Sequence, residues 1–331
     1  MSLISGQAVK RVALIGTGVI GGGWAARCLA HGLDVIATDP APGAEDALRT
    51  NVDNAWPALQ EVGLASSADR SRLEFTSDVA AAVGNADFIQ ENVPEREELK
   101  IEVFRQVSEV APTNVVIASS SSGLLPSRLQ SNCTHPERLV IGHPFAPVYL
   151  LPLVEIVGGE HTSLDAVRCA ASFYKGIGMR PLHVRREIEA YVADRLQEAL
   201  YREALHLIND GIATVPEIDA AITGGPGLRW AFMGTFMAWH LGGGPGGMRH
   251  TIEQFGPALK LPWTKLVAPE LTEELKARVV EGCEQEAGDR DFQELERRRD
   301  QCLVHIQKVL AQYWYAPGED GWPEVDLGDG S

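Results

Sequence analysis

A histidine and a glutamate lie in apolar sequence that predicts two successive strands. His143 ends the segment Leu139–His143 and is followed by Pro144, and Glu155 interrupts the apolar run from Leu151 to Val157. A carboxylate inside an apolar strand needs a partner. If the two strands are neighbours, Glu155 accepts a hydrogen bond from one imidazole nitrogen, and the other nitrogen can act as a general base. A structural histidine–glutamate pair at a sheet edge is the alternative interpretation.

A glycine-rich turn near the start of the chain predicts a dinucleotide site. It follows the apolar segment Val12–Ile15, opens an amphipathic run, and is followed by a second apolar segment that ends in Asp39. In such a turn the first glycine allows a tight bend, the second admits a pyrophosphate and the third lets the helix pack on the strand. An aspartate about 20 residues later binds ribose hydroxyls and repels a 2′-phosphate, which predicts NAD rather than NADP. The expected cofactor contacts are Gly16, Gly18, Val19, Ile20, Gly21 and Asp39. A glycine turn in an unrelated α/β protein is the alternative.

Two further polar segments follow predicted strands. Ser119–Ser122 follows a strand expected at Val115–Ser119, which brings several hydroxyls to the edge of the sheet where ligands bind. A plain turn is the alternative. Glu91–Glu95 follows a strand expected at Asp87–Gln90, and with Lys100 it could reach the nicotinamide ribose or simply begin a capped helix.

The elements that position these residues alternate between strands and helices up to about residue 184, with further strands expected at Arg72–Thr76 and Leu153–Val157. This alternation predicts a Rossmann-type, doubly wound and mostly parallel sheet with ligands outside the carboxyl ends of its strands. From Glu187 to Asn209 the apolar residues recur at helical spacing, and helices dominate afterwards. We therefore expect an NAD-binding domain over residues 1–185, an all-helical domain over 186–317, whose substrate and dimerisation roles are implied by the family resemblance given below, and an acidic flexible tail over 318–331.

Composition narrows the range of partners. The 331 residues are 45% hydrophobic and carry a formal net charge of −16, which argues against nucleic acid or an anionic membrane as a partner and favours a small molecule. The five cysteines form no C-x-x-C pair, so we expect no metal site and reduced thiols. No segment predicts a signal peptide or a membrane span, and a cytoplasmic location is expected.

The order and spacing of several motifs are characteristic of one family. These motifs are the glycine turn, Glu91 with Pro94-Glu95 and Lys100, Ser122-Gly123-Leu124, Gly142-His143-Pro144-Phe145, and Pro152-Leu153-Val154-Glu155. Together they resemble the 3-hydroxyacyl-CoA dehydrogenase superfamily over nearly the whole chain. The resemblance implies that His143 is the catalytic base, that Glu155 orients and supports it, and that Ser122 hydrogen-bonds the reacting oxygen. It also implies a homodimer formed through the helical domain.

The second domain resembles the carnitine-oxidising branch of that superfamily. The similarity lies in Ala193-Asp194-Arg195-Leu196, Gly227-Leu228-Arg229-Trp230-Ala231, Gly247-Met248-Arg249-His250 and Pro262-Trp263-Thr264-Lys265-Leu266. The acyl-CoA and sugar-acid branches carry an asparagine where this chain has Asp194. A fixed negative charge favours a cationic substrate such as L-carnitine. An aspartate that pairs with Arg195 or caps a helix locally is the alternative.

This resemblance also suggests the remaining substrate contacts. Aromatic faces attract quaternary ammonium groups, so we expect Phe145, Tyr191 and Trp230 to border the cation. The substrate carboxylate needs a donor, for which Arg229 or a serine of the turn would serve. The chain departs from the family after Phe145, because it has Ala146 where the family usually places an asparagine, and an alanine forms no side-chain hydrogen bond.

Two other functions remain open at this point. The first is the same chemistry on an anionic substrate, either a sugar acid such as L-gulonate or a short 3-hydroxy acid, and Asp194 argues against it. The second is a catalytically impaired NAD-binding relative, which Ala146 favours and which the retention of His143 and Glu155 opposes. Turnover with each substrate separates these functions.

Overall fold

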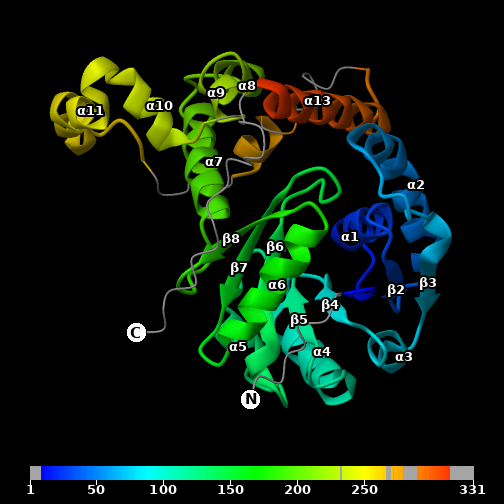
Figure 1. Cartoon of the computed structure of the whole chain (residues 1–331). Helices are drawn as coiled ribbons and strands as arrows, with labels where there is room; N and C mark the ends of the chain where they lie inside the picture. Colours follow the sequence, from blue (N-terminus) through cyan, green and yellow to red (C-terminus); the bar gives the residue numbers. More distant parts are fainter. Residues whose placement is uncertain are drawn as a thin grey trace. The chain divides into compact units, whose positions relative to one another are not determined.

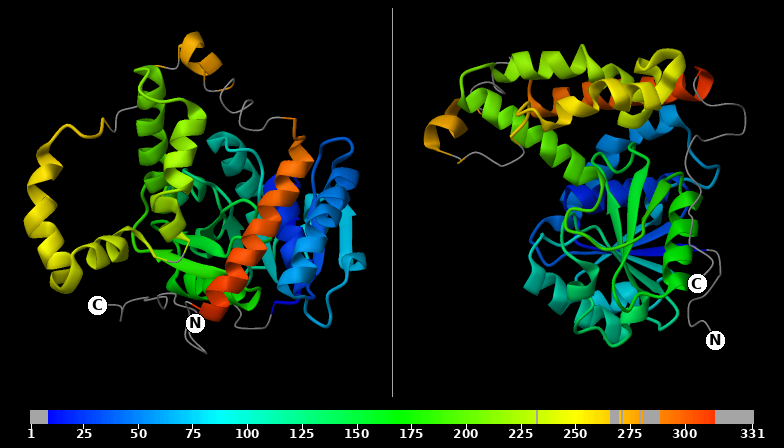
Figure 2. Two further views of the ribbon diagram at one scale, coloured as in Figure 1. Left: turned by 90° about the horizontal axis from the view of Figure 1, so that it is seen from above. Right: turned by 90° about the vertical axis from the view of Figure 1, so that its left-hand side faces the viewer.

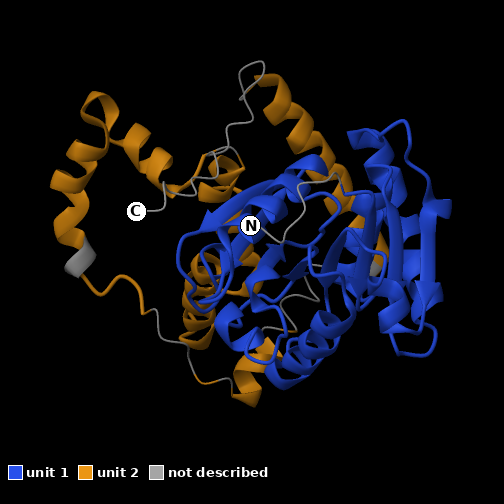
Figure 3. Ribbon diagram, turned by 60° about the horizontal axis from the view of Figure 1, so that its bottom comes forward, with its two compact units in different colours: residues 1–194, 319–331 blue, residues 195–318 orange. Residues whose placement is uncertain are grey.

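The computed structural model describes residues 9–231, 233–265, 270, 272–278, 280 and 289–313. They belong to two compact units, residues 1–194 and residues 195–318 (Figure 3). Each unit is described below by itself. The acidic tail expected over residues 318–331 lies outside the described residues.

The first unit is built on one eight-stranded sheet. Its strands are β1 (Arg11–Ile15), β2 (Asp34–Thr38), β3 (Leu73–Thr76), β4 (Phe88–Glu91), β5 (Val116–Ser119), β6 (Leu139–Pro144), β7 (Leu153–Gly158) and β8 (Arg180–Val184). Their order across the sheet is β3-β2-β1-β4-β5-β6-β7-β8 (Figure 1). Neighbouring strands are parallel except for β6 and β7, which are antiparallel. The predicted Rossmann-type, mostly parallel sheet is confirmed.

The sequence does not predict β8, and its composition explains why. Pro181 lies inside the strand and pairs with Val154 of β7. A proline cannot donate to a ladder and normally argues against a strand. Because β8 is the last strand of the sheet, it needs partners on one side only, and the missing N–H is tolerated there.

Helices cover both faces of this sheet (Figure 2). They are α1 (Val19–Ala30), α2 (Ala44–Val62), α3 (Val79–Val83), α4 (Glu97–Val110), α5 (Pro126–Leu129) and α6 (Leu164–Gly176). Alternate residues of β1 enter two separate cores. Val12 and Leu14 pack in the core that includes residues of α1, α2 and α6, whereas Ala13 and Ile15 pack in the core that includes residues of α3, α4 and α5. Burial on both faces explains the nearly continuous apolar composition of the central strands.

The described part of the second unit is helical, as predicted. Its helices are α7 (Ala193–Asn209), whose first two residues belong to the first unit, α8 (Val215–Thr223), α9 (Pro226–Trp230), α10 (Thr235–Gly242), α11 (Gly247–Phe255) and α13 (Phe292–Tyr313). Short 3-10 helices lie at Gly244–Gly246 and Gly256–Lys260 in this unit, and at Arg70–Arg72 and Pro136–Arg138 in the first unit. Ile208, Val215 and Leu275 form a small buried cluster. Within the described residues, no helix combines the length and the apolar character that a bilayer span requires.

The start of α7 corrects one expectation. The apolar spacing predicts a helix from Glu187, but the helix begins at Ala193. Ala190 and Tyr191 have φ values of 58° and 48°, in the left-handed region, which is incompatible with a right-handed helix. Alanine and tyrosine rarely adopt this conformation, so the sequence carries no signal for the turn that they form.

Candidate active site

The glycine turn between β1 and α1 has the shape of a dinucleotide site. Gly16 has a φ of 89°, which favours glycine, and a side chain there would lie 2.8 Å from the backbone of Asn92. A Cβ atom on Gly21 would lie 2.1 Å from the carbonyl oxygen of Gly16, so the helix packs against the turn through that glycine. A Cβ on Gly18 would meet nothing within 4 Å. Of the three glycines, Gly18 therefore has open space where a pyrophosphate would approach.

The surroundings of this turn suit an anion and a ribose. Helix α1 begins after Gly18 without a side-chain cap and without an acidic residue in its first turn, so its N-terminal N–H groups favour an anion. Asp39 follows β2, and its Oδ2 accepts a hydrogen bond from the backbone N–H of Thr17 at 2.9 Å. Its Oδ1 accepts one from the N–H of Ala41 at 2.9 Å. These bonds hold the carboxylate beside the turn, where it can still accept from ribose hydroxyls.

The antiparallel pairing of β6 with β7 creates the histidine–glutamate pair. His143 lies directly opposite Glu155 in the register, and its Nδ1 is 3.0 Å from Oε2 of Glu155. The side chains are 3% and 0% exposed. An ionised carboxylate accepts the Nδ1 proton, so the neutral imidazole presents Nε2 as its basic nitrogen. This is the tautomer that a general base requires.

The second oxygen of Glu155 is held by the start of α7. The backbone N–H groups of Val192 and Ala193 donate to Oε1 at 3.0 Å each. A helix N-terminus favours a negative charge, and charge-assisted hydrogen bonds are stronger than neutral ones. Both oxygens of Glu155 therefore have fixed partners, which fixes the plane of the carboxylate and, through it, the imidazole of His143.

The Nε2 side of His143 faces a second carboxylate. Oδ2 of Asp194 lies 3.5 Å from Nε2, and the Asp194 side chain is 23% exposed. The ring of Phe145 lies 4.7 Å from the imidazole centroid in an edge arrangement. Negative charge and an aromatic ring thus lie together beside the nitrogen expected to take a proton.

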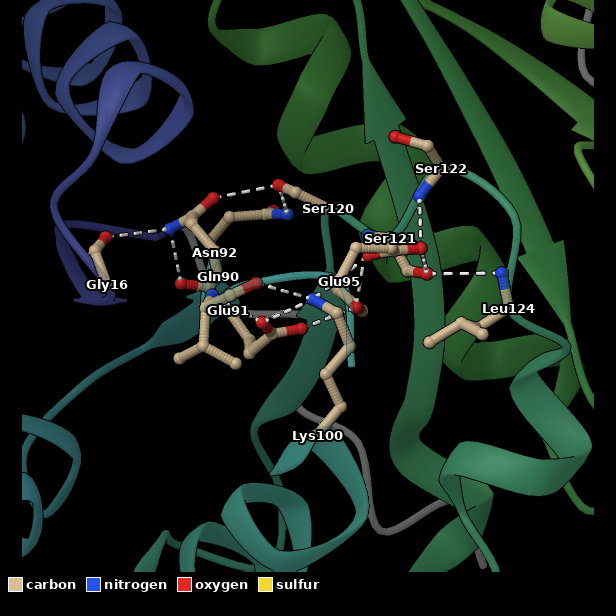
Figure 4. Close-up of polar contacts among 12 residues, drawn as sticks. Gly16, Gln90, Glu91, Asn92, Glu95, Lys100, Ser120, Ser121, Ser122 and Leu124 are labelled. Atoms are coloured by element: carbon tan, nitrogen blue, oxygen red, sulfur yellow. Dashed lines mark hydrogen bonds and ion pairs between the residues drawn. The ribbon is translucent and has the colours of Figure 1, made fainter. Parts of the chain in front are cut away.

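The serine turn after β5 is organised by Glu95 (Figure 4). Oε1 of Glu95 accepts hydrogen bonds from the hydroxyl of Ser121, from the N–H of Ser122 at 3.0 Å and from the N–H of Gly123 at 3.2 Å. Within the described part of the chain no contact involves Ser122 Oγ. Because β5 and β6 are parallel neighbours, this turn and His143 lie at the same edge of the sheet. The hydroxyl of Ser122 is available to a ligand there.

A buried ion pair lies beneath the turn (Figure 4). Nζ of Lys100 donates to Oε1 of Glu91 at 2.7 Å and to the carbonyl oxygen of Val93 at 2.9 Å, and it lies 3.5 Å from Oε2 of Glu95. Oε2 of Glu91 accepts from the hydroxyl of Ser119 at 2.5 Å. Burial raises the pKa of Glu91, although the ammonium of Lys100 and the hydrogen bonds oppose the shift. The pair connects β4, α4 and the end of β5.

Ser120 connects the turn to the glycine loop. Its Oγ accepts from the indole Nε1 of Trp24 at 3.0 Å and donates to Oδ1 of Asn92 at 2.8 Å. Nδ2 of Asn92 in turn donates to the carbonyl oxygen of Gly16 at 3.4 Å (Figure 4). The glycine turn and the serine turn, which lie at the same edge of the sheet, are therefore joined through the side chains of Asn92 and Ser120, the residues directly after β4 and β5.

Comparison with known proteins assigns the chain to a family. Residues 11–188 match the family described as 3-hydroxyacyl-CoA dehydrogenase, NAD binding domain, and residues 191–282 match its C-terminal domain. The chain belongs to the 3-hydroxyacyl-CoA dehydrogenase family. The protein is an NAD-dependent dehydrogenase. The prediction of NAD as its cofactor is confirmed by the match to the NAD-binding domain of the family.

The chain is similar to known proteins over most of its length. It is 59% identical over 304 residues to the L-carnitine dehydrogenase of Pseudomonas aeruginosa, covering 92% of this chain and 95% of the relative. It is 55% identical over 308 residues to the L-carnitine dehydrogenase of Bacillus cereus, covering 93% and 94%. Among solved structures, it is similar to 5-formyl-3-hydroxy-2-methylpyridine 4-carboxylic acid 5-dehydrogenase, an NAD+-dependent dismutase. The TM-score is 0.78 and the identity 26%, over 92% of this chain and 99% of that one.

Four of the expected site residues lie close to one another in the first unit. His143, Glu155, Asp194 and Phe145 lie in direct contact or within 5 Å of the imidazole. Arg229 and Trp230 end α9 in the second unit, and both are exposed. Val19 is 74% exposed at the first turn of α1, and Ile20 is partly buried there.

Two of the expected contacts have protein partners instead. Lys100 is 1% exposed and its ammonium faces two carboxylates and a carbonyl oxygen, so the contacts of the ammonium are made within the protein. Tyr191 is fully buried, and its hydroxyl donates to the carbonyl oxygen of Leu124 at 2.7 Å. The sequence also gives no indication that Val192 and Ala193 hold Glu155, because both act through the backbone.

Proposed function

We propose that this protein oxidises the 3-hydroxyl of L-carnitine to 3-dehydrocarnitine. The observation that carries the proposal is the carboxylate of Asp194 beside the base in a chain 55–59% identical to proteins named L-carnitine dehydrogenase. NAD+, held by the glycine turn, the start of α1 and Asp39, supplies the hydride acceptor. The residues of the chain bind and orient the alcohol and move its proton.

His143 is the general base in this scheme. Its Nε2 takes the hydroxyl proton, and Glu155 stabilises the imidazolium that forms while keeping the ring oriented. Ser122 Oγ donates a hydrogen bond to the oxygen of the developing carbonyl. The hydrogen bonds from Ser122 and Gly123 to Glu95 hold the turn, so this donor is pre-positioned.

Asp194 selects for the cation. In carnitine the ammonium nitrogen is bonded to the carbon next to the one that carries the hydroxyl. A carboxylate 3.5 Å from Nε2 of His143 is therefore close to the ammonium when the hydroxyl is at the base. At an effective dielectric constant of about 20 and a separation of about 5 Å, the attraction is on the order of 3 kcal/mol. Phe145 adds an aromatic surface for the methyl groups.

The remaining substrate contacts are assigned by residue type. We propose Arg229 as the donor to the substrate carboxylate and Trp230 as a residue that borders the cation. Tyr191, which the sequence also places beside the cation, is buried and packs against the imidazole of His143. A cytoplasmic location stays a prediction. Domain roles are proposed as 1–185 for NAD and 186–317 for substrate and dimerisation.

A homodimer completes the proposal. The second unit exposes large apolar side chains that a monomer gains nothing by presenting to water, among them Phe236 at 82%, Trp263 at 69% and Leu228 at 66%. We expect analytical ultracentrifugation to give twice the chain mass, and Phe236→Glu to shift the protein towards monomer. A single species of one chain mass at micromolar concentration contradicts the dimer.

The proposal is tested first by turnover. NADH formation at alkaline pH is followed with L-carnitine and L-gulonate side by side, and with NADP+ as the control cofactor. Turnover of carnitine alone with NAD+ supports the proposal. Oxidation of gulonate moves the protein to the sugar-acid branch. No turnover despite NADH binding identifies Ala146 as a disabling departure from the family.

The role of Asp194 is tested by removing one charge from the protein or from the substrate. Asp194→Asn is expected to lower kcat/KM for L-carnitine by about two orders of magnitude, which corresponds to the Coulomb attraction above. The same variant is expected to use 3-hydroxy-5,5-dimethylhexanoate, the carbon isostere that keeps the carboxylate and lacks the ammonium charge, as well as the unmodified protein does. An equal loss with both substrates shows that Asp194 acts on His143 or on folding rather than on the cation.

A further inference from the structure

Two parts of the site come from distant segments of the chain, and one short segment contacts both. The serine turn follows β5, and the His143–Glu155 pair lies on β6 and β7. Residues 190–193 connect to each of them. The backbone N–H of Ala190 donates to the carbonyl oxygen of Gly123 at 3.5 Å, while Val192 and Ala193 donate to Glu155.

Tyr191 is the centre of this segment. Its side chain is 0% exposed, and its ring centroid lies 5.5 Å from that of His143. Its hydroxyl donates to the carbonyl oxygen of Leu124, two residues after Ser122, at 2.7 Å. One side chain thus touches the imidazole with its ring and the serine turn with its hydroxyl.

The hydroxyl is a permanent donor. Burial raises the pKa of Tyr191 well above its ordinary value, and the negative charges of Glu95, Glu155 and Asp194 add to the shift, while Ser121 opposes it. The hydroxyl therefore stays protonated, and its bond to Leu124 persists at alkaline pH.

The backbone conformation at Tyr191 also supports this arrangement. Ala190 and Tyr191 both hold positive φ, which costs a non-glycine residue on the order of 1 kcal/mol or more. Such a conformation persists only where its surroundings enforce it. Here it turns the chain so that the next two N–H groups point at Glu155, and the N–H of Tyr191 itself donates to the carbonyl oxygen of Ile188 at 3.2 Å.

We propose that Tyr191 is a positioning residue that holds Ser122 and the His143–Glu155 pair in register for hydride transfer. This inference rests on the proposed function. It assigns to Tyr191 a role in aligning the donor to the reacting oxygen with the base, in place of the direct substrate contact expected from the sequence. Misplacing a reacting group by about 1 Å can cost up to about a hundredfold in rate, so an alignment carried by one buried hydroxyl has a measurable effect.

The test is Tyr191→Phe, which removes the hydroxyl and keeps the ring. We expect kcat with L-carnitine to fall about tenfold. The KM for NAD+ is expected to stay unchanged, because Tyr191 contacts neither the glycine turn nor Asp39. The primary deuterium isotope effect with carnitine deuterated at C3 is expected to rise, because hydride transfer becomes slower than the other steps.

A matched control variant distinguishes a loss of positioning in Tyr191→Phe from a general loss of stability. Tyr174→Phe removes another fully buried tyrosine hydroxyl of the first unit, one that donates to Gln90 Oε1 at 2.6 Å. Gln90 in turn donates to Ser120 Oγ at 2.8 Å, so this hydroxyl reaches the serine turn only through a second side chain and not through Leu124. Tyr174→Phe is expected to lower the Tm by a similar amount and to leave the isotope effect unchanged. A Tyr191→Phe protein with unchanged kcat, or with a lower kcat and an unchanged isotope effect, overturns the proposal.

A second measurement does not depend on turnover. Hydrogen exchange of the peptide that contains Ser122 and Leu124 is compared between Tyr191→Phe, Tyr174→Phe and the unmodified protein. We expect faster exchange in Tyr191→Phe alone. Equal exchange in all three proteins refutes the link between Tyr191 and the turn even if carnitine proves not to be the substrate. Absence of carnitine turnover in the unmodified protein, with the exchange result as expected, refutes only the proposed function.

Discussion

Replacing Lys100 by methionine tests the buried ion pair beneath the serine turn. The side chains of Lys100 and Glu91 are 1% and 0% exposed, and 2.7 Å separates Nζ from Oε1. Methionine keeps most of the volume of the lysine stem and removes the ammonium. Glu91 then keeps its hydrogen bonds from Val93 and Ser119 but loses the charge that balances its own.

The size of the effect follows from the burial. Removing one partner of a buried pair typically costs about 3–5 kcal/mol, because it leaves an uncompensated charge in the protein. Glu91 can escape part of this cost by binding a proton, since burial already raises its pKa and Lys100 opposes that shift. We therefore expect Lys100→Met to lower the free energy of unfolding by about 3–5 kcal/mol at about pH 7.5.

The loss of unfolding free energy in Lys100→Met is expected to depend on pH, and the protonation of Glu91 determines the sign of this dependence. In the unfolded variant Glu91 releases its proton near its ordinary pKa of about 4.3, whereas in the folded variant the raised pKa retains the proton to higher pH. The folded state binds more protons in this window, so stability falls as the pH rises. Because burial already raises the pKa of Glu91 in the unmodified protein, the gap between the two proteins is expected to widen only above the pH at which Glu91 ionises there, by up to about 1.4 kcal/mol per pH unit until Glu91 also ionises in the folded variant.

Urea unfolding followed by circular dichroism at several pH values measures this gap. The double variant Glu91→Gln with Lys100→Met buries no charge and is expected to recover most of the lost stability. Arg105→Met is the exposed control, because Arg105 pairs with Glu102 on the surface of α4, and it is expected to change stability little. A gap below about 1 kcal/mol, or one that does not change with pH, refutes the electrostatic reasoning.

Other predictions concern the backbone and the thiols. Ala190→Gly is expected to leave the Tm unchanged or raise it, because relief of about 1–2 kcal/mol at positive φ offsets the extra unfolded-state entropy of glycine; a clear drop in Tm contradicts the strain. Gly18→Ala is expected to fold normally and to bind NADH more weakly. Gly21→Ala is expected to be less stable, because its new Cβ meets a carbonyl oxygen at 2.1 Å. Calorimetry of both proteins with and without NADH measures the two effects. Burial raises the pKa of Cys28 to about 12, so a thiol reagent at about pH 8 should modify the exposed Cys302 before Cys28, and early modification of Cys28 would show that α1 opens readily.

The sequence predicts those parts of the site whose partners are close along the chain. The glycine turn is predictable because its three glycines lie close together between one strand and the next helix. The structure leaves no room for a Cβ atom at Gly16 or Gly21 and open space at Gly18. The pairing of His143 with Glu155 is predictable because the two strands follow each other and the polar residues fall in register. The sheet itself follows from strand and helix patterns in regular alternation, and only β8, with a proline inside it, departs from them.

The sequence does not predict which partner a polar side chain takes, or where the backbone leaves the helical region. Lys100 reads equally well as a ligand contact and as a helix residue, and only the fold shows that Glu91 and Glu95 surround its ammonium. The start of α7 is misplaced because apolar periodicity continues through Ala190 and Tyr191, whose backbone conformation leaves the helical region. In both cases the outcome depends on how the chain folds around the residue, which the local pattern of residue types does not specify.

The site fixes its carboxylates mainly through the backbone, and this explains why its supporting residues carry no motif. One oxygen of Glu155 is held by the N–H groups of Val192 and Ala193, which leaves the other for the imidazole; one oxygen of Glu95 is held by Gly123 and its neighbours in the turn. Backbone donors are already oriented when the chain folds, so the carboxylates need little reorganisation when charge develops in the reaction. A backbone N–H can donate in this way almost regardless of which side chain its residue carries. Valine, alanine and glycine can therefore define the geometry of the site while the sequence around them looks like ordinary helix and turn.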